Sequence, residues 1–445
     1  MYAVYTLLTI LAFVVASPWF AWQAFRHHKY VGSLGQRLGR LPVGINVDED
    51  ASVWVHAVSV GEVLAARALI PDLRRRYPHL RIFLSTTTRT GQQVAQQRVP
   101  DADGVFYFPL DLPFSVRRTL DRIRPHLFVM VETEIWPTLL RACRARGVKT
   151  ALVNGRISAR SYPRYRLIRP VLRRVLADVD RFCMQSEESA RRVIDIGAPL
   201  DRVSVTGSLK FDALEVPGPM TGASGPDRVL RYFRVREGRP VLIAASTLDG
   251  EEGPVLAAFR EVQRGEPDAL LVVAPRHPER FDEVTARARA EGFRVARRSA
   301  LPIDAEPRAE VVVLDTIGEL ARLFQVATAV FVGGSLVNAG GHNILEPAVF
   351  GKPVVFGPHM QNFAEIAAMF LENGAAVQVD SPRGLTETLV ALTRDPVQRA
   401  SLGAAARALV AANRGARERT LDVLAALLPP GTPRGGVVMP FRRAQ

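Results

Sequence analysis

The chain has 445 residues, too many for one typical core, and its length suggests two or three domains. With 48% hydrophobic and 23% charged residues it has an ordinary globular composition, and its two cysteines, Cys143 and Cys183, exclude a disulfide framework and lack metal-ligand spacing. The net charge of +14 and the pI of about 10.5 indicate an anionic partner: nucleic acid, an acidic lipid surface or an acidic substrate. Because the arginines are spread over many segments, a charged surface is favoured over a nucleic-acid-binding arm.

The N-terminal segment is predicted to be a membrane anchor. Residues 2–25 contain no charged side chain, and their apolar run YTLLTILAFVVA belongs to a stretch long enough to cross a bilayer core of about 30 Å. Arg26, His27 and Lys29 follow at once, and by the positive-inside rule this flank stays in the cytoplasm. We therefore expect a transmembrane helix at 1–25 and a cytoplasmic body; an interfacial helix and a buried or cleaved segment are the alternatives.

From residue 51 onward apolar strands alternate with helices, which is typical of a parallel sheet with right-handed crossovers. In the first half we predict strands at Ser52–Val58, Arg81–Ser85, Leu127–Val131, Thr150–Val153 and Phe182–Gln185. The main helices are predicted at Glu62–Arg76, Trp136–Arg146 and Tyr162–Ala177, the last with a possible kink at Pro170.

A stretch rich in proline and glycine, residues 215–227, interrupts this alternation and is predicted to be an interdomain linker. After it we predict strands at Val241–Ala245, Leu270–Ala274, Val311–Leu314, Ala329–Val332 and Val354–Phe356. We therefore expect an α/β protein with two domains, residues 26–214 and 228–428, facing a cleft, and a disordered tail at 429–445. In such sheets ligands bind outside the carboxyl ends of the strands.

Glu62 is the first candidate catalytic residue. The segment HAVSVGE, residues 56–62, leaves a strand and enters a helix, which puts Glu62 at the carboxyl end of that strand. To act as a general base near pH 7 it must be partly desolvated, because a glutamate has a pKa of about 4.3 in water. The alternative is structural, since Ser59 and Glu62 fit the S-x-x-E capping box of a helix start.

Two further segments place charged side chains at strand ends of the first half. In ETEIWP, residues 132–137, Glu132 and Glu134 are candidates for catalysis or substrate orientation, or they cap the helix that follows. In GSLKFD, residues 207–212, Lys210 either neutralises an anionic donor or is an exposed surface lysine.

Three successive strand ends of the second domain carry residues suited to a nucleotide. Pro275-Arg276 closes one strand, where the guanidinium can bind a phosphate through two hydrogen bonds, and Ile317-Gly318-Glu319 follows the next. The third segment is glycine-rich, from Gly333 to Gly341, and leads into a predicted helix at HNILE, residues 342–346. A helix start offers unpaired N–H groups to a phosphate, and the Glu346 carboxylate can accept hydrogen bonds from sugar hydroxyls. An ordinary tight loop is the alternative.

Residues 156–174 form a basic amphipathic stretch with seven arginines. It can contact an anionic membrane, or it is a solvated helix face. The sequence has no Walker A pattern, no G-x-S-x-G, no H-E-x-x-H and no cysteine metal site. The D-x-D match at residues 178–180 lies away from the proposed nucleotide loops, so we assign no metal site.

Six motifs in order resemble those of the Kdo (3-deoxy-D-manno-octulosonic acid) transferases of lipopolysaccharide biosynthesis. They are HAVSVGE (56–62), ETEIWP (132–137), NGRIS (154–158), GSLKFD (207–212), PRHPERF (275–281) and GGHNILEPA (340–348). The resemblance implies a GT-B fold, with two Rossmann-like domains, the acceptor site in the first and the nucleotide-sugar site in the second. It also implies that a single-pass anchor holds the protein in the inner (cytoplasmic) membrane, with the catalytic domains facing the cytoplasm.

The resemblance further implies a reaction: inverting transfer of Kdo from CMP-Kdo to a lipid A precursor (lipid IVA), with release of CMP and without a metal or other cofactor. Glu62 then looks like the general base, and Glu132 and Lys210 match positions associated with transition-state stabilisation. The residues that match the CMP-binding segments are Pro275, Arg276, Ile317, Gly318, Glu319, Asn343, Ile344, Leu345 and Glu346.

The expected partners are therefore CMP-Kdo, the lipid A precursor and an anionic membrane surface, and not nucleic acid. The donor, the acceptor and the membrane lipids are all anionic, which fits the net charge of +14. Two alternatives remain open: another GT-B glycosyltransferase that uses a UDP-sugar, and a non-catalytic, membrane-anchored basic binding protein.

Overall fold

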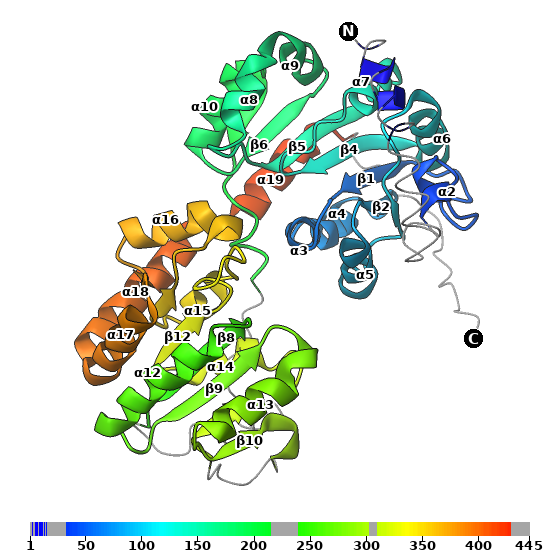
Figure 1. The fold of residues 1–445 in the computed structure, drawn as a ribbon. Helices are drawn as coiled ribbons and strands as arrows, with labels where there is room; N and C mark the ends of the chain where they lie inside the picture. The colour runs from blue at the N-terminus through cyan, green and yellow to red at the C-terminus, as the bar shows by residue number, and fades with distance from the viewer. Residues whose placement is uncertain are drawn as a thin grey trace. The chain divides into compact units, whose positions relative to one another are not determined.

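The computed structural model describes residues 33–214, 239–301 and 309–428, together with several helical residues between Tyr2 and Val15. The chain divides into two compact units: unit 1 is residues 1–213 and 414–445, and unit 2 is residues 214–413. Each unit contains one seven-stranded, entirely parallel sheet with helices around it, as Figure 1 shows. The predicted α/β class with two Rossmann-like domains is therefore confirmed. The predicted linker and tail lie outside the described residues.

The predicted anchor also lies largely outside the described residues. Within the described part of the chain, none of the helices combines the length and the apolar character needed to span a bilayer. The described N-terminal residues lie against unit 1 near α7 (Pro137–Ala145), as Figure 1 shows. The Tyr2 hydroxyl donates to Asp178 at 2.7 Å, and the Arg141 guanidinium lies 4.2 Å from the centre of the Tyr2 ring. The Tyr5 hydroxyl donates to Asp111 at 3.0 Å.

The sheet of unit 1 has the strand order β3-β2-β1-β4-β5-β6-β7, so the order reverses between β1 and β4. Its strands are β1 (Ser52–His56), β2 (Arg81–Thr86), β3 (Gly104–Tyr107), β4 (Pro125–Val131), β5 (Lys149–Gly155), β6 (Arg181–Met184) and β7 (Val203–Val205). Its helices are α2 (Leu34–Arg37), α3 (Val60–Arg67), α4 (Ile70–Arg76), α5 (Arg89–Arg98), α6 (Pro113–Ile123), α7, α8 (Tyr162–Leu167), α9 (Arg169–Leu176), α10 (Glu187–Asp195), the 3-10 turn η1 (Leu200–Arg202) and α19 (Ala416–Ala425). Ligands of such sheets bind where the strand order reverses.

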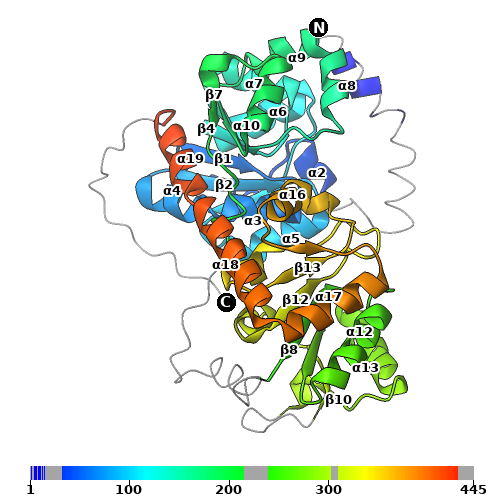
Figure 2. The ribbon, with the colours of Figure 1, turned by 90° about the vertical axis from the view of Figure 1, so that its left-hand side faces the viewer.

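Both faces of this sheet are buried, because neighbouring residues of a strand point to opposite sides. Trp54 and Phe128 point to a core that includes residues of α6, α7 and α9, whereas Val53 and Val55 point to a second core that includes residues of α3, α4 and α19. Figure 2 shows α19 beside α4, where Arg76 and Glu418 form a 2.7 Å ion pair.

The last helix corrects the predicted domain boundary. Residues 414–428 were assigned to the second domain, but α19 belongs to unit 1. Gly415, with φ of 88°, is the N-cap of α19, and Leu421 and Leu424 complete the core of unit 1. A periodic apolar helix gives no sequence signal for the domain on which it packs.

The helices of unit 1 are shorter than predicted. The helix expected at Glu62–Arg76 is two helices, α3 and α4, with Pro71 in the first turn of the second. The helix expected at Tyr162–Ala177 breaks between α8 and α9 at Ile168, because Pro170 has no N–H to continue the hydrogen bonding of α8 and fits only in the first turn of a new helix.

The sheet of unit 2 has the order β10-β11-β9-β8-β12-β13-β14 and reverses between β8 and β12. Its strands are β8 (Val241–Thr247), β9 (Leu270–Pro275), β10 (Val295–Arg297), β11 (Val311–Val313), β12 (Ala329–Val332), β13 (Val354–Phe356) and β14 (Val377–Gln378). Its helices are α12 (Glu252–Gly265), α13 (Phe281–Ala290), α14 (Leu320–Leu323), α15 (Leu345–Val349), α16 (Ala364–Glu372), α17 (Pro382–Arg394) and α18 (Pro396–Ala412), with 3-10 turns η2 (Pro278–Arg280), η3 (Arg298–Ala300), η4 (Phe324–Val326) and η5 (Gln361–Phe363).

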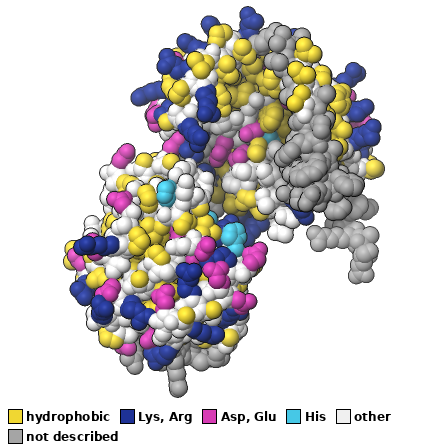
Figure 3. All heavy atoms as spheres, viewed as in Figure 1, with side chains coloured by type: hydrophobic (Ala, Val, Ile, Leu, Met, Phe, Trp, Pro, Cys, Tyr) yellow, Lys and Arg dark blue, Asp and Glu magenta, His cyan; other side chains and the backbone are white. Residues whose placement is uncertain are grey.

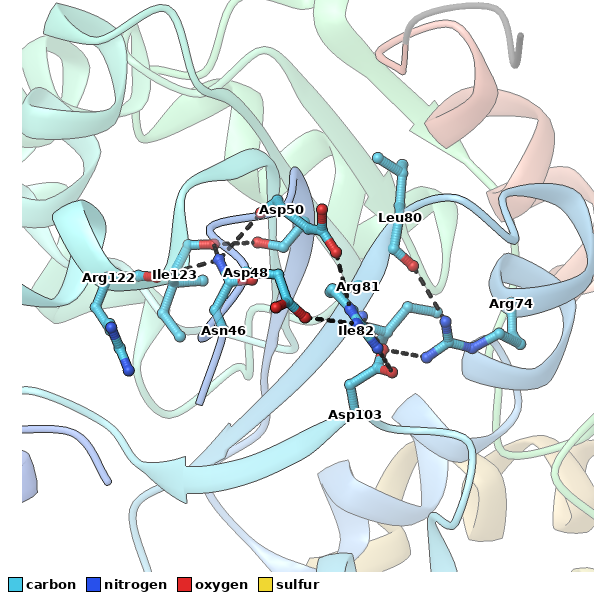
Figure 4. A network of polar contacts seen from close by, with 11 residues as sticks. Asn46, Asp48, Asp50, Arg74, Leu80, Arg81, Ile82, Asp103, Arg122 and Ile123 are labelled. Atoms are coloured by element: carbon cyan, nitrogen blue, oxygen red, sulfur yellow. Dashed lines mark hydrogen bonds and ion pairs between the residues drawn. The ribbon is translucent and has the colours of Figure 1, made fainter. Parts of the chain in front are cut away.

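Basic side chains are spread over the visible face of both units, as Figure 3 shows, rather than gathered into one patch. Several of them stabilise the amino ends of the strands. Arg81, at the start of β2, reaches Asp48, Asp50 and Asp103 at 3.2 to 3.3 Å, and Arg74 binds Asp103 as well (Figure 4). This network fixes the segment before β1 at the amino end of the sheet, which leaves the opposite, carboxyl edge available for chemistry.

We predict that Asp212→Ala loosens α19. The Asp212 carboxylate accepts hydrogen bonds from the N–H groups of Gly415 at 2.9 Å and Arg417 at 2.8 Å, and losing such a helix-start acceptor costs about 1–2 kcal/mol. Hydrogen exchange followed by mass spectrometry should show faster exchange in residues 416–425. Asp422→Ala is the control, because its exposed 3.3 Å ion pair with Arg76 is worth about 0–1 kcal/mol. Equal exchange in both variants would contradict the role of Asp212.

Candidate active site

The carboxyl edge of unit 1 brings together the three residues predicted to be catalytic. Glu62 lies in the first turn of α3, directly after β1, and Glu132 follows β4 across the point where the strand order reverses. Lys210 follows β7, and its ammonium lies 3.5 Å from the Glu132 carboxylate. Glu134 lies 3.8 Å from His56, the last residue of β1, and the charges of Glu132 and Glu134 raise the pKa of Glu62.

Glu62 is almost fully buried, with 8% of the residue exposed. Its carboxylate accepts hydrogen bonds from the Val58 N–H at 2.8 Å and from the Ser59 hydroxyl at 2.9 Å. The reciprocal capping box is absent, because the Ser59 side chain does not accept a hydrogen bond from the helix start. Burial, and then the charges of Glu132 and Glu134, raise the pKa of Glu62 to about 7, although the hydrogen bonds from Val58 and Ser59 lower it. A carboxylate that titrates near neutral pH is suited to general-base catalysis.

Two residues at this edge have a left-handed backbone, which is uncommon outside glycine and is concentrated at functional sites. They are Glu132, with φ of 65°, and Asn154, with φ of 54°, at the ends of the neighbouring strands β4 and β5. The Asn154 side chain accepts a hydrogen bond from the Leu209 N–H at 3.0 Å, which places Lys210 beside Glu132. Sequence reasoning missed this role of Asn154, although an asparagine at a strand end suits a left-handed position.

His56, the last residue of β1, was also missed. It is fully buried, its Nδ1 lies 3.2 Å from the Ser85 carbonyl oxygen, and its ring stacks on Phe108 with centroids 3.7 Å apart. Its Nε2 is 3.8 Å from the Glu134 carboxylate, but burial lowers the pKa of His56 and keeps the ring neutral, so the contact is not a charged pair. The Trp136 indole N–H orients Glu134 by donating to it at 3.0 Å.

In unit 2 the glycine-rich loop after β12 is organised around Glu251, a residue that the sequence did not indicate. Glu251 is fully buried, and its carboxylate accepts hydrogen bonds from the N–H groups of Gly334 (2.7 Å), Ser335 (3.0 Å), Leu336 (3.0 Å) and Leu248 (2.9 Å). The first three N–H groups belong to the loop that leads towards α15, and a carboxylate of the protein occupies them. The helix start that was predicted to bind a phosphate lies beyond them, at residues 342–346.

The start of α15 is capped in a similar way. The Asn343 side chain accepts from the Leu345 N–H at 3.1 Å and donates to Glu346 at 3.0 Å. The side chains of Ile344 and Leu345 are fully buried, so only their backbone is available to a ligand. The Leu345 N–H is therefore already used by Asn343 and is not one of the unpaired N–H groups expected at this helix start. Contacts of these four residues with CMP stay a prediction.

The other residues predicted to bind the nucleotide differ in whether their side chains already have partners within the protein. Arg276 is exposed after β9, whereas Arg280 in the same motif is bound by Glu252 at 2.6 Å. After β11, Glu319 forms an ion pair with Arg298 at 3.0 Å, and Ile317 is 83% exposed. Arg276 is thus available to an anion and Ile317 to an apolar ring, at the same edge of the sheet.

Within the described ranges, no group of three or more His, Cys, Asp or Glu side chains is arranged to hold a metal ion. The carboxylates of the D-x-D match are engaged elsewhere. Asp180 accepts from the Thr150 N–H at 2.8 Å, and Asp178 accepts from Tyr2 and from Arg144 at 2.9 Å.

We predict that Glu62→Gln stabilises the protein at high pH. The pKa of Glu62 is raised on folding, so between about pH 4.5 and 7 the folded state holds a proton that the unfolded chain has released, and wild-type stability falls across this window. The variant should gain about 2–3 kcal/mol in the free energy of unfolding at pH 8 and little at pH 4, as measured by denaturant unfolding. The exposed Glu418→Gln should show no such difference. A variant less stable than wild type at pH 8 would refute the claim that burial raises the pKa of Glu62.

Comparison with known proteins places these observations in a family. The sequence profile described as 3-deoxy-D-manno-octulosonic-acid transferase (kdotransferase) matches residues 32–213. The 3-deoxy-D-manno-octulosonic acid transferase of Haemophilus influenzae is 37% identical over 378 residues, which cover 84% of this chain and 86% of that protein.

Among solved structures, the C-terminal CMP-Kdo binding domain of WaaA from Acinetobacter baumannii is 31% identical, with a TM-score of 0.39, over 42% of this chain and 95% of that domain. The UDP-GlcNAc 2-epimerase of Neisseria meningitidis is 13% identical, with a TM-score of 0.58, over 84% of this chain and 100% of the epimerase, a likeness of fold alone. On the strength of the sequence identity over most of its length, the chain belongs to the 3-deoxy-D-manno-octulosonic acid transferase family, and is a Kdo-transferring glycosyltransferase.

Proposed function

We propose that the protein transfers Kdo from CMP-Kdo to a hydroxyl of a lipid A precursor, with inversion and without a metal ion. The observation that carries this proposal is the buried Glu62, whose pKa of about 7 leaves it able to take a proton at neutral pH. Glu62 removes the proton of the acceptor hydroxyl, and the hydroxyl oxygen attacks the anomeric carbon of Kdo from the face opposite to CMP. The bond from that carbon to the phosphate oxygen breaks, and CMP leaves with the electron pair.

The neighbouring charges support this assignment. Glu132 and Glu134 raise the pKa of Glu62, which makes the carboxylate a stronger base than a solvated glutamate. Lys210, 3.5 Å from Glu132, provides a cation that compensates negative charge as the hydroxyl loses its proton. In unit 2 the exposed guanidinium of Arg276 can balance the charge of the departing phosphate.

A UDP-sugar is the second candidate donor, because a protein of similar fold, the N. meningitidis epimerase, is bound to UDP-GlcNAc. Titration of the protein with CMP and with UDP separates the two donors. Binding of CMP in preference to UDP supports CMP-Kdo, and the reverse preference would overturn it. Transfer that continues in the presence of EDTA supports the metal-free reaction.

We also propose that unit 1 lies on the inner membrane, through an anchor at residues 1–25 and the outer surface of α8 and α9. Figure 3 shows hydrophobic and basic side chains together over the end of unit 1 that carries these helices. Leu167 is 83% exposed, and Val171 is exposed beside the exposed Arg173 and Arg174. Apolar side chains flanked by arginines suit the headgroup region of anionic lipids, and this surface would keep the catalytic units on the cytoplasmic side.

We predict that Glu62→Ala lowers kcat at least about a thousandfold and leaves the affinity for CMP unchanged, because the base is lost.

In the wild type, kcat/KM should fall as the pH drops below about 7, since the protonated carboxyl cannot accept a proton. Glu134→Gln should move this limb to lower pH, because it removes a negative charge that raises the pKa of Glu62. The exposed Glu187→Gln is the matched control. An acid limb that stays in place in Glu134→Gln would argue against this electrostatic coupling.

We predict that replacing both Arg173 and Arg174 with glutamate weakens binding to vesicles that contain phosphatidylglycerol by at least about tenfold, since each basic residue near an anionic surface contributes about 1 kcal/mol. A chain without residues 1–25 keeps the anchor from masking the effect. Arg383→Glu, an exposed arginine of unit 2, should bind as the unchanged chain does. Equal binding of all three proteins would exclude α9 from the membrane surface.

A further inference from the structure

Three basic side chains of unit 2 meet where its strand order reverses. Arg276 and His277 follow β9, and His342 lies in the loop between β12 and α15. The loops after β9 and β12 both attach to the end of β8, because the Arg276 N–H donates to the Thr247 carbonyl oxygen and the Gly333 N–H to that of Ala245. The three residues therefore lie at one edge of the sheet, and the charges of Arg276 and His277 lower the pKa of His342.

The backbone holds this basic cluster of Arg276, His277 and His342 in place. The Arg276 N–H donates to the Thr247 carbonyl oxygen at 3.0 Å, which attaches the loop after β9 to the end of β8. The His342 ring packs on Gly334, where an added Cβ would lie only 3.0 Å from the imidazole. Gly334 is in turn fixed by the Glu251 carboxylate, so the ring has a rigid support.

The charge of this cluster is not balanced by the protein. Arg276 and His277 are exposed, and among the residues that the structure describes neither forms an ion pair with a carboxylate. Arg280, four residues after Arg276, has ion pairs with Glu252 at 2.6 Å and with Glu283 at 2.9 Å. Nε2 of His342 is buried without a hydrogen-bond partner in the described structure. A fixed basic cluster with an unsatisfied imidazole is a place where an anion is stabilising.

We propose that His342 is a further residue of the donor site: it binds the phosphate of the nucleotide beside Arg276 and takes up a proton as it does so. The proposal rests on the proposed function for the identity of the nucleotide. Neither the motif match to the CMP-binding segments nor the sequence reasoning assigned a role to His342.

The proton uptake follows from the charges around the ring. Burial, and then the charges of Arg276 and His277, lower the pKa of His342 to about 4, so the imidazole is neutral at pH 7 in the free protein. On the same loop, the Glu346 carboxylate is engaged by Asn343, and the Glu251 carboxylate is bound to the N–H of Gly334, on which the ring packs. A phosphate dianion adds two negative charges and reverses this balance, which raises the pKa of His342 in the complex.

The sign of the pH dependence is therefore defined. A group whose pKa is higher in the complex than in the free protein binds a proton on complex formation, so affinity rises as the pH falls. The phosphate itself has a second pKa of about 6, so the effect is clearest between about pH 6.5 and 8, where CMP is mainly a dianion.

The test is calorimetric titration of the full chain with CMP and with cytidine, which lacks the phosphate, in buffers of different ionisation enthalpy. This measurement gives the number of protons taken up for each nucleotide bound. For the wild type we expect uptake with CMP and none with cytidine. His342→Asn should lose the uptake and bind CMP about tenfold more weakly, the loss of one charge-assisted hydrogen bond, with unchanged affinity for cytidine.

Two matched histidine variants complete the experiment. His126→Asn, at an exposed position at the amino end of β4, should behave as the wild type in all titrations. If the uptake persists in His342→Asn and vanishes in His277→Asn, the proton belongs to His277 and the assignment to His342 is overturned. Equal loss of CMP and cytidine affinity in His342→Asn would also overturn it, because the role would then be structural.

Failure of the proposed function would look different. A wild type that binds UDP and not CMP would contradict the proposed donor, and the same titrations with UDP and uridine would still decide the role of His342. A wild type that bound neither nucleotide would overturn both proposals.

Discussion

Carboxylates held by backbone N–H groups are the constraint on which both units depend. Glu251 accepts four such hydrogen bonds and shapes the loop after β12, and Asp111 accepts from the start of α7 at Thr138 and Leu139. Asp212 holds the start of α19 in the same way. Although the chain carries a net charge of +14, these acids are tied to the backbone rather than to arginine, so the loops beside the sites are rigid while basic side chains stay available to ligands.

The two units use opposite charges to prepare their side chains for chemistry. In unit 1 burial and two neighbouring glutamates push the pKa of Glu62 upward, so that the group is a useful base near neutral pH. In unit 2 burial and the neighbouring basic residues Arg276 and His277 push the pKa of His342 downward, so that the ring is uncharged until an anion arrives. In both cases desolvation is the largest effect and the adjacent charges add to it.

Features that depend on residues close together in the sequence could be predicted, whereas contacts between residues far apart in the sequence could not. Strands such as β4 are predictable because continuous apolar runs are buried on both faces, whereas β7 and β14 have only two or three residues and no detectable pattern. The grouping of Glu62 with Glu132 and Lys210 follows from motifs at strand ends. The role of Glu251 does not, because the loop residues that it binds lie 83 to 85 positions further along the chain.

The return of the chain to unit 1 has a consequence for biosynthesis. Residues 1–213 leave the ribosome roughly 200 residues before α19 does, a delay of about 10–40 s at ordinary translation rates. Throughout that interval one face of the first sheet lacks Leu421 and Leu424, which complete its core. Unit 2 is one continuous segment and is fully synthesised before them. The half of the enzyme that is translated first is therefore the last to finish folding, and its nascent form exposes apolar surface that a chaperone would cover.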